Sequence, residues 1–329
     1  MHSTPTLLHY RPWQGQLGGS WRLVWPIARV SLAMILRRKL FWIVYALSLT
    51  LFLMFFFGQY LLAWAESQSA EQSINIPGFR NPQKTTEVID YLKNKVKLNG
   101  SPETYQRFIN LQAKMVMIVL AMAGSILVGN DFRFGTLPFY LSKPLNRWHY
   151  LIGKCLAVAA FVNLVTTLPA LALFAQYGML GDNWEYFLGE GKSLELGGLS
   201  VTTPVNPLLF GILGYGVVLT LCLSLMLVAI AVWLRKTVPM IMIWTTVFVF
   251  LPEFTFALVD GLHYSPGWRL LDIWNNMFLV GSYLLGLGYQ LTGDVNQPPV
   301  YAAGLVLLVV CATCLIYLNL RIRAVEVVR

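Results

Sequence analysis

The sequence predicts an all-α polytopic membrane protein with six transmembrane helices. Of its 329 residues, 57% are hydrophobic and only 12% are charged, whereas about a quarter of the residues of a soluble domain are charged. The apolar residues gather in long stretches, and every charged residue falls outside six of them. These stretches are residues 40–64, 115–130, 155–180, 207–234, 237–252 and 298–320.

Helices suit these stretches because about 20 apolar residues cross roughly 30 Å of hydrocarbon, and a helix satisfies its own backbone polar groups. No segment alternates in the way of a barrel strand. Two stretches are short. We expect the stretch at 115–130 to borrow the preceding turn, with Lys114 reaching to the interface. We expect the stretch at 237–252 to continue past Pro252 and Glu253 to about Leu258.

The charges of the connecting segments indicate the orientation. Fifteen Lys and Arg and two acids lie in residues 1–39, 130–154, 235–236 and 321–329. Nine Lys and Arg and 13 acids lie in residues 65–114, 181–206 and 253–297. Because basic loops stay in the cytoplasm, we expect both termini there and the chain in the plasma (inner) membrane. This topology accounts for the net charge of +9, so nucleic-acid binding is not predicted.

The segment before the first span has two parts. Residues 1–20 are aperiodic and are expected to form a cytoplasmic arm. Residues 21–39 carry apolar side chains at near-helical spacing, with Arg22, Arg29 and Ser31 off the stripe. This pattern predicts an amphipathic elbow helix in the cytoplasmic interface, and the alternative is a cytoplasmic extension of the first span. The apolar run after it is too long for a cleavable signal peptide.

Two outer segments are expected to be structured. Residues 65–114 predict a small helical hairpin, whose second helix begins at Ser101-Pro102-Glu103, an N-cap pattern leading into the second span. Residues 273–293 are uncharged and long enough to span, but they contain several amide side chains and four glycines. We therefore predict short outer re-entrant or interfacial helices between spans five and six, rather than a seventh span.

Catalytic and metal-binding chemistry is not predicted. Cys155, Cys222, Cys311 and Cys314 lie in or at the edge of spans, where cysteine packs as a small apolar residue. None of the four histidines lies in a span, so neither a zinc site nor an intramembrane protease is expected. We expect no cofactor or metal bound by this chain, and the protein is not predicted to be an enzyme.

Phosphate binding and ion coupling are also not predicted. The segment 189–193 resembles the end of a phosphate loop, but Tyr186 stands where that loop needs glycine. Ion-coupled carriers use intramembrane carboxylates, and Glu253 is the nearest candidate. We expect it to mark an outer helix end or to face an external cavity.

The loop at 130–154 is the most informative stretch. It begins with an acid and a glycine turn, continues as a short amphipathic piece and ends in basic residues that lead into the third span. Such a piece offers Leu137, Tyr140 and Leu141 to a cytoplasmic partner. The alternative is an ordinary connecting loop with a positive-inside bias.

This loop resembles that of the type-2 ABC transporter permeases, and in particular the group of copper-enzyme maturation and gliding-motility systems. The matching residues are Asp131, Gly135, Thr136, Leu137, Leu141, Ser142, Pro144, Arg147, Gly153 and Lys154. Arg133 departs from the pattern, because the family often has a second acid there. The resemblance extends to the elbow helix, the six spans, the outer helices and the basic tail.

The resemblance implies a single transmembrane permease domain over residues 1–329, with its coupling loop at 130–154. In this family the loop docks on separate soluble ABC ATPase subunits, which bind ATP and Mg²⁺, and a second copy or a paralogous permease completes the path. The alternative is an ATPase-independent membrane protein, either an ion-coupled carrier or a scaffold that anchors outer-face partners through 65–114.

Polar residues within the spans allow two interpretations. Asn163, Thr166, Thr167 and Thr220 are candidates to line a transport path. Alternatively, they form hydrogen bonds between packed helices.

Overall fold

The computed structural model confirms the all-α class. It describes residues 24–69, 100–124, 126–127, 131, 147–181, 193–196, 199–202, 208–234, 236–288 and 296–321. Within these residues, six helices are long and apolar enough to cross a membrane. They are Lys39–Leu61, Pro102–Gly124, Trp148–Met179, Leu208–Leu234, Thr237–Gly261 and Val300–Arg321.

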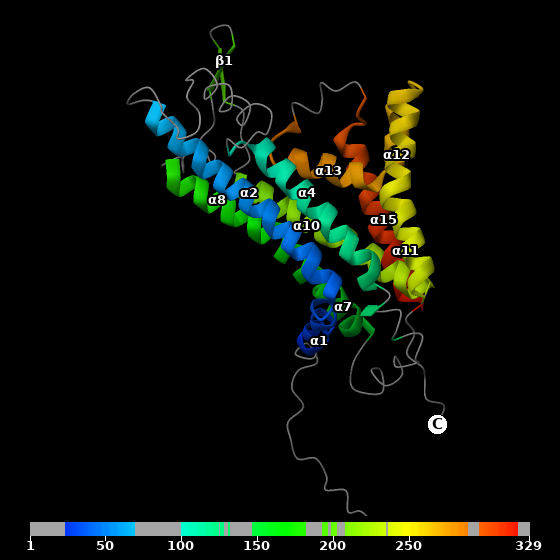
Figure 1. Ribbon diagram of the computed structural model, residues 1–329. Coiled ribbons are helices and arrows are strands. Elements are labelled where there is room, and N and C mark those ends of the chain that lie inside the picture. The colour runs from blue at the N-terminus through cyan, green and yellow to red at the C-terminus, as the bar shows by residue number, and fades with distance from the viewer. Residues whose placement is uncertain are drawn as a thin grey trace, which may run out of the picture.

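The elements follow one another along the chain as a helical bundle with one hairpin (Figure 1). The α-helices are α1 (Val24–Leu36), α2 (Lys39–Ser69), α4 (Pro102–Gly124), α7 (Arg147–Val165), α8 (Thr167–Gly181), α10 (Leu208–Leu234), α11 (Thr237–Thr245), α12 (Leu251–Phe256), α13 (Ile273–Leu284) and α15 (Val300–Arg321). Two π-helical turns, η4 (Thr246–Phe250) and η5 (Ala257–Gly261), and one 3₁₀ turn, η6 (Pro266–Leu271), complete the helical elements. Strands β1 (Ser193–Leu196) and β2 (Leu199–Thr202) pair antiparallel, Ser193 opposite Thr202, and the sequence analysis did not predict them.

The bundle has two ends, which we call the α1 end and the α13 end after the helices that lie there. At the α1 end, α2, α7 and α11 begin, and α4, α10 and α15 end (Figure 1). At the opposite, α13 end, α13 lies across the bundle. Because the six long helices alternate in direction, the start of α2 and the end of α15 lie at the same end.

Helix α10 is the centre of the bundle. It packs against α4, α7, α8, α11, α13 and α15. No charged residue occurs among its 27 residues. Such a helix, apolar on every side, is stable only when neighbouring helices or lipid surround it.

Glycines let α10 approach its neighbours closely. A Cβ atom added at Gly211 would lie 2.6 Å from the Leu284 carbonyl oxygen, which belongs to α13. A Cβ atom at Gly216 would collide with the Thr167 side chain of α8, and one at Gly281 of α13 would collide with Tyr215. Small residues at these crossings allow the van der Waals contact that holds membrane helices together.

The third span is broken into α7 and α8 at Thr166. Pro169 has no backbone N–H and so donates no helical hydrogen bond, although the Thr166 N–H still donates to the Val162 carbonyl oxygen and the Ala170 N–H to the Thr166 carbonyl oxygen. The Thr166 hydroxyl also donates a 2.8 Å hydrogen bond to the Val162 carbonyl oxygen, which already accepts the Thr166 backbone N–H at 2.9 Å.

The second and fifth spans are longer than their apolar stretches. The second begins at Pro102, as the Ser-Pro-Glu pattern predicts, and is described as a continuous helix to Gly124. It therefore contains Arg107 and Lys114, which precede the apolar stretch at 115–130 and belong to the helix expected to lead into it. Its polar face is turned partly inward, where Gln112 Nε2 donates to the Ser48 carbonyl oxygen at 2.9 Å.

The fifth span passes through Pro252, as expected, and continues to Gly261. The π-helical turn η4 directly precedes α12, whose second residue is Pro252. Such a turn adjusts the backbone where proline removes a hydrogen bond. Glu253 consequently lies within the span and not at its end.

Helix α1 is separate from α2, because the chain turns at Arg37 and Arg38 between them. Its buried stripe is Val24, Ala28, Ser31 and Ile35, and it packs on α7. Ser31 is thus buried, contrary to the predicted stripe, and Trp25 is 67% exposed. The interfacial elbow position stays a prediction.

Helix α13 lies in the segment that resisted assignment from sequence. Its 12 residues extend about 18 Å at 1.5 Å per residue, which is too short for a crossing of roughly 30 Å. The chain turns after it at Gly286, whose φ is 85°. The predicted re-entrant arrangement stays a prediction, and the predicted outer hairpin at 65–114 falls largely on residues 70–99, which lie outside the described part.

The contact at Gly211 generates a test. We expect Gly211→Ala to lower the thermal stability of the purified protein, because its neighbours are backbone atoms and overpacking costs about 1–3 kcal/mol. The matched control is Gly304→Ala in α15, where the nearest atom would be 3.9 Å from the new methyl group. That change should leave thermal unfolding unchanged or raise its midpoint, since alanine favours a helix by up to about 1 kcal/mol. Equal effects at both positions would contradict the packing.

Candidate functional site

A buried ion pair closes the two ends of the 130–154 loop. The Lys154 ammonium lies 2.8 Å from Asp131 Oδ2, and the two side chains are only 2% and 12% exposed. Asp131 follows α4, and Lys154 lies in the second turn of α7. The pair therefore joins the end of the second span to the start of the third.

Two further contacts complete this arrangement, which we call the loop clamp: Asp131, Tyr150, Lys154 and the Leu127 carbonyl. The Tyr150 hydroxyl donates a 2.8 Å hydrogen bond to Asp131 Oδ2. Lys154 Nζ donates a 2.5 Å hydrogen bond to the Leu127 carbonyl oxygen. Burying two charges is unfavourable unless both are paired and hydrogen-bonded, and the loop clamp meets that condition.

Sequence reasoning selected Asp131 and Lys154 but missed Tyr150 as part of the site. The missed signal is the spacing of Tyr150 and Lys154, which are four residues apart and so share one face of α7. The Tyr150 side chain is fully buried, and its ring centroid lies 5.5 Å from Lys154 Nζ.

Gly153 fixes the neighbouring contact between α7 and α1. A Cβ atom at this position would lie 2.8 Å from Ile27 Cγ2 and 3.3 Å from the Val24 carbonyl oxygen. Only glycine therefore allows α1 to lie so close to the first turns of α7. The loop motif thus places Lys154, which belongs to the loop clamp, directly after Gly153, which lets α1 pack on α7.

The other predicted coupling residues are less completely described. Arg147 is the first residue of α7, and only its backbone is described. Gly135, Thr136, Leu137, Leu141, Ser142 and Pro144 lie outside the described residues. A role of this loop in docking stays a prediction.

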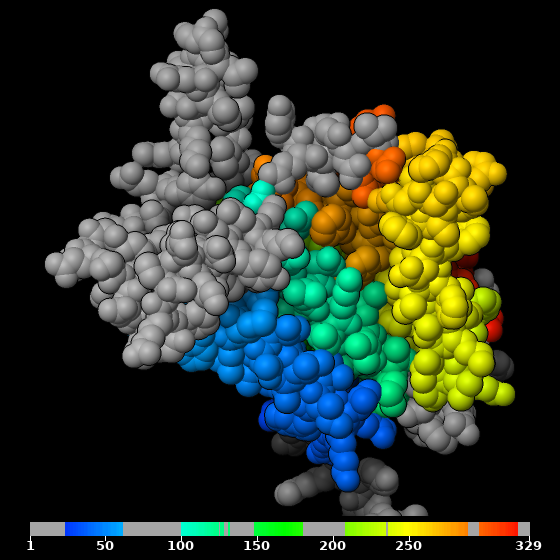
Figure 2. Space-filling view, turned by 45° about the horizontal axis from the view of Figure 1, so that its top comes forward, coloured from blue at the N-terminus to red at the C-terminus, as the bar shows by residue number. Residues whose placement is uncertain are grey.

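A groove runs between α4 and the fifth span, and we call it the α4–α12 groove. Its volume is about 620 Å³, within the range of about 300–1,000 Å³ typical of ligand sites. It lies between the teal α4 and the yellow α11 and α12 in Figure 2. Trp244 forms part of its floor, and its indole Nε1 donates a 3.1 Å hydrogen bond to the Met117 carbonyl oxygen, joining α11 to α4.

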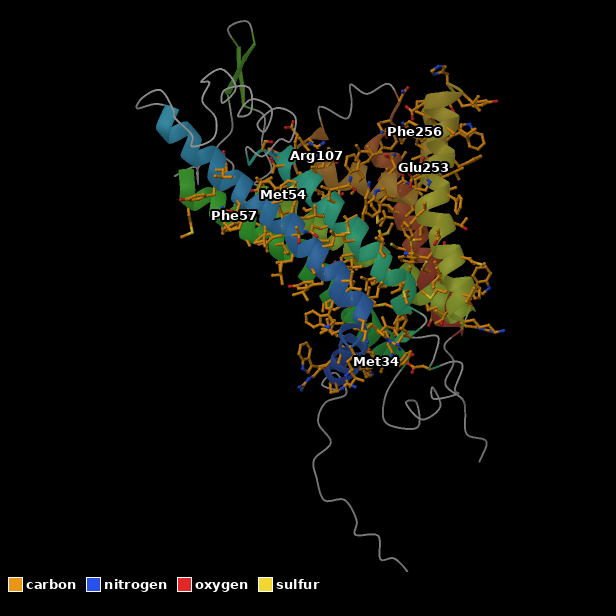
Figure 3. The ribbon with its side chains drawn as sticks, viewed as in Figure 1. Met34, Met54, Phe57, Arg107, Glu253 and Phe256 are labelled. Carbon is orange, nitrogen blue, oxygen red and sulfur yellow. The ribbon has the colours of Figure 1, made fainter. Side chains whose placement is uncertain are left out.

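Sequence reasoning did not find this groove, although it expected Glu253 to mark a helix end or face a cavity. Glu253 lines both the α4–α12 groove and a smaller cavity of about 230 Å³ toward the α13 end. Figure 3 shows Glu253 on α12 beside Phe256, with Arg107 on α4 across from them.

The smaller cavity contains charged groups that already have partners. Arg269 forms an ion pair with Asp260. Asp272 caps α13, because its Oδ1 accepts hydrogen bonds from the backbone N–H groups of Trp274 (2.9 Å) and Asn275 (3.1 Å). Burial raises the pKa of the Asp272 carboxyl, while these two N–H groups and Arg269 act in the opposite direction.

The polar residues within the third and fourth spans hydrogen-bond to one another. Asn163 Nδ2 donates to Thr220 Oγ1 at 3.1 Å, and Thr167 Oγ1 donates to Asn163 Oδ1 at 2.7 Å. Thr166, Thr167 and Thr220 are buried. These contacts support the second interpretation of the sequence, in which the polar side chains form hydrogen bonds between packed helices.

All four cysteines are free thiols. Cys222 of α10 and Cys311 of α15 have their Sγ atoms 3.7 Å apart. Across the described ranges, no three His, Cys, Asp or Glu side chains gather in a group that could hold a metal ion.

Comparison with known proteins agrees with this architecture. The profile of a family described as ABC-2 family transporter protein matches residues 25–262, more than two thirds of the chain. The chain belongs to this ABC-2 family. No curated protein matches it.

The ABC-2 family match covers most of the features described above. It begins within α1, contains the loop clamp and every lining residue of the α4–α12 groove except Trp274, and ends just past η5. ABC-2 proteins are membrane components of ABC transporters and are not themselves catalytic. The chain is therefore a multi-pass permease subunit of an ABC transporter, of a family that associates with ABC ATPases.

The loop clamp predicts a strong coupling between its two charges. Lys154→Met removes the cation that pairs with the buried Asp131 carboxylate, and we expect the free energy of unfolding to fall by about 3–5 kcal/mol. Combining Lys154→Met with Asp131→Asn should restore much of this loss. Denaturant unfolding of the purified variants measures both effects.

A matched control for these variants is Lys236→Met, an exposed cation at the same end of the bundle. Its effect should stay within about 0.5 kcal/mol. If the double variant of the loop clamp lost the sum of the two single losses, the two charges would act independently and the coupling would be refuted.

Proposed function

We propose that the chain moves a substrate across the plasma membrane, driven by ATP hydrolysis in separate soluble ABC ATPase subunits. The observation that carries this proposal is the loop clamp. It holds the ends of the 130–154 loop together in a chain that belongs to the ABC-2 family. This buried ion pair fixes the two ends of the loop relative to each other.

The loop clamp gives the docked ATPases a path to the spans. A force on the loop acts on α4 and α7 together, because Asp131 and Lys154 are joined by a direct contact. Helix α1 moves with α7, since Gly153 lets the two helices lie in close contact. The two membrane states need to differ by only a few kcal/mol for ATP binding to reverse their populations.

The α1 end is the cytoplasmic end in this proposal. Charged residues at this end are mostly basic, with Arg37, Arg38, Lys39, Lys236 and Arg321 close to the helix ends. Basic residues remain on the cytoplasmic side of a membrane. Both termini are then cytoplasmic, and ATP and Mg²⁺ bind on the partner ATPases below the loop clamp.

A second permease, either another copy or a paralogue, completes the path. Three spans are little covered by the rest of the chain: 17% of the apolar window of α2 is buried, 17% of the fifth span and 11% of α15. On α2, Met54 and Phe57 are exposed (Figure 3). Exposed apolar surface of this extent is covered by lipid or by another subunit.

The loop motif supports a narrower grouping within the ABC-2 family. It resembles the permeases of copper-enzyme maturation and gliding motility, on the residues given above, and this grouping is part of the proposal. No cofactor is assigned to this chain itself.

Affinity purification of the tagged chain from native membranes in mild detergent tests the proposal. We expect a soluble ATPase with a phosphate-binding loop to co-purify in stoichiometric amount, identified by mass spectrometry. A chain that purifies repeatedly without an ATPase would overturn the proposal in favour of an ion-coupled carrier or a scaffold acting through 65–114.

Charge reversal at the start of α7 tests the docking site. Arg147→Glu is expected to abolish permease-stimulated ATPase activity, because it reverses a charge on the proposed docking surface, while membrane insertion is retained. Lys236→Glu is the matched control, because it reverses a cation at the same end outside the loop. Full stimulation by the Arg147→Glu protein would refute docking through this loop.

A further inference from the structure

The α4–α12 groove opens on the surface of the bundle along its apolar length. Its walls include Ile118 and Met122 of α4, and Val249 of η4, all exposed by 40–54%. Trp244 and Phe248 lie beneath them and are almost completely buried. Because both walls belong to spans, the opening faces the region of the acyl chains.

Two opposite charges face this groove from its two walls. Lys114 lies on α4 and Glu253 on α12, both exposed and both lining the groove. Neither side chain has an ion pair or hydrogen bond to any other residue that the structure describes. Both residues lie inside long helices and not at the helix ends. An unpaired charge inside a membrane-spanning helix is costly.

The two charges lie at one end of the groove. Lining residues such as Met122 on α4 and Ile241 on α11 lie nearer the α1 end. Lys114 and Glu253 therefore lie toward the α13 end of the groove. Beyond Glu253 the smaller cavity continues with Arg269, Asp272 and Asn275. The site therefore changes from apolar to charged to polar along its length.

Among the carboxylates at that polar end, Glu253 remains available for a ligand. Asp260 accepts from Arg269, and Asp272 caps α13. A ligand that fits the whole site has an apolar chain and a head group that carries one negative and one positive charge.

We propose that the α4–α12 groove binds a membrane lipid with a zwitterionic head group. Its acyl chain lies against Ile118, Met122 and Val249. Its phosphate pairs with Lys114, and its ammonium group pairs with Glu253. The binding of this lipid in the groove does not depend on the proposed function. Its role as the transported molecule does.

Native mass spectrometry of the full-length chain in mild detergent tests this binding without any ATPase. The probes are phosphatidylethanolamine and phosphatidylglycerol with identical acyl chains. We expect the zwitterionic lipid to bind preferentially. Lys114→Gln and Glu253→Gln should each weaken its binding about tenfold, the size expected when a charged hydrogen-bonding partner is removed.

The two variants should differ with the anionic lipid. Glu253→Gln leaves Lys114 as the only facing charge, so binding of phosphatidylglycerol should rise. Lys114→Gln leaves only Glu253, so that binding should fall. Ala121→Trp, which fills the groove, should weaken both lipids, and Lys236→Gln should change neither. Unchanged thermal unfolding shows that each variant is folded.

Two outcomes would overturn the proposal. In the first, the Glu253 and Lys114 variants keep the head-group preference of the unmodified chain. The two charges would then not recognise the lipid head group. In the second, a second copy fills the groove: Ile118→Cys then cross-links two chains efficiently, and no lipid binds at any ratio. Either result leaves the co-purification of an ATPase unaffected, so failure here is distinguishable from failure of the proposed function.

Discussion

Close packing around α10 is the constraint on which the rest of the structure depends. Helices in lipid gain little from the hydrophobic effect, and they associate through van der Waals contact and interhelical hydrogen bonds. Gly211 and Gly216 bring α13 and α8 to the surface of α10. The Asn163–Thr220 hydrogen bond joins α10 to α7 at mid-span. The helices that surround α10 then define where the loop clamp and the α4–α12 groove lie.

The distribution of apolar residues predicted the number of spans because lipid excludes most charged side chains. It was less accurate where a helix uses one polar face inside the protein. In the second span, the Gln112 side chain is buried against α2 and donates to the Ser48 carbonyl oxygen. The fifth passes Pro252 as expected, directly after the π-helical turn η4, and ends at Gly261, slightly beyond the expected Leu258. Such adjustments depend on neighbours that are distant in sequence.

The candidate site was also only partly predictable from the sequence. A family resemblance identified Asp131, Gly153 and Lys154 as residues of one loop, but loop residues give no indication of which side chains meet. Their pairing depends on α4 and α7 lying side by side at the α1 end. The groove was missed because Lys114 and Glu253 are far apart in the chain. Only the packing of α11 on α4, through Trp244 and Met117, brings them to one site.

The break at Thr166 has a mechanical consequence. An unbroken third span would behave as one rod, and any tilt at its loop end would reappear in full at its other end. Two rods joined at a proline-weakened turn bend at the joint instead. The two parts also have different neighbours: α7 packs on α1, whereas α8 packs on α2, where Gln176 Nε2 donates to the Phe56 carbonyl oxygen. Bending of the third span is therefore expected at this joint, where proline removes one backbone hydrogen bond.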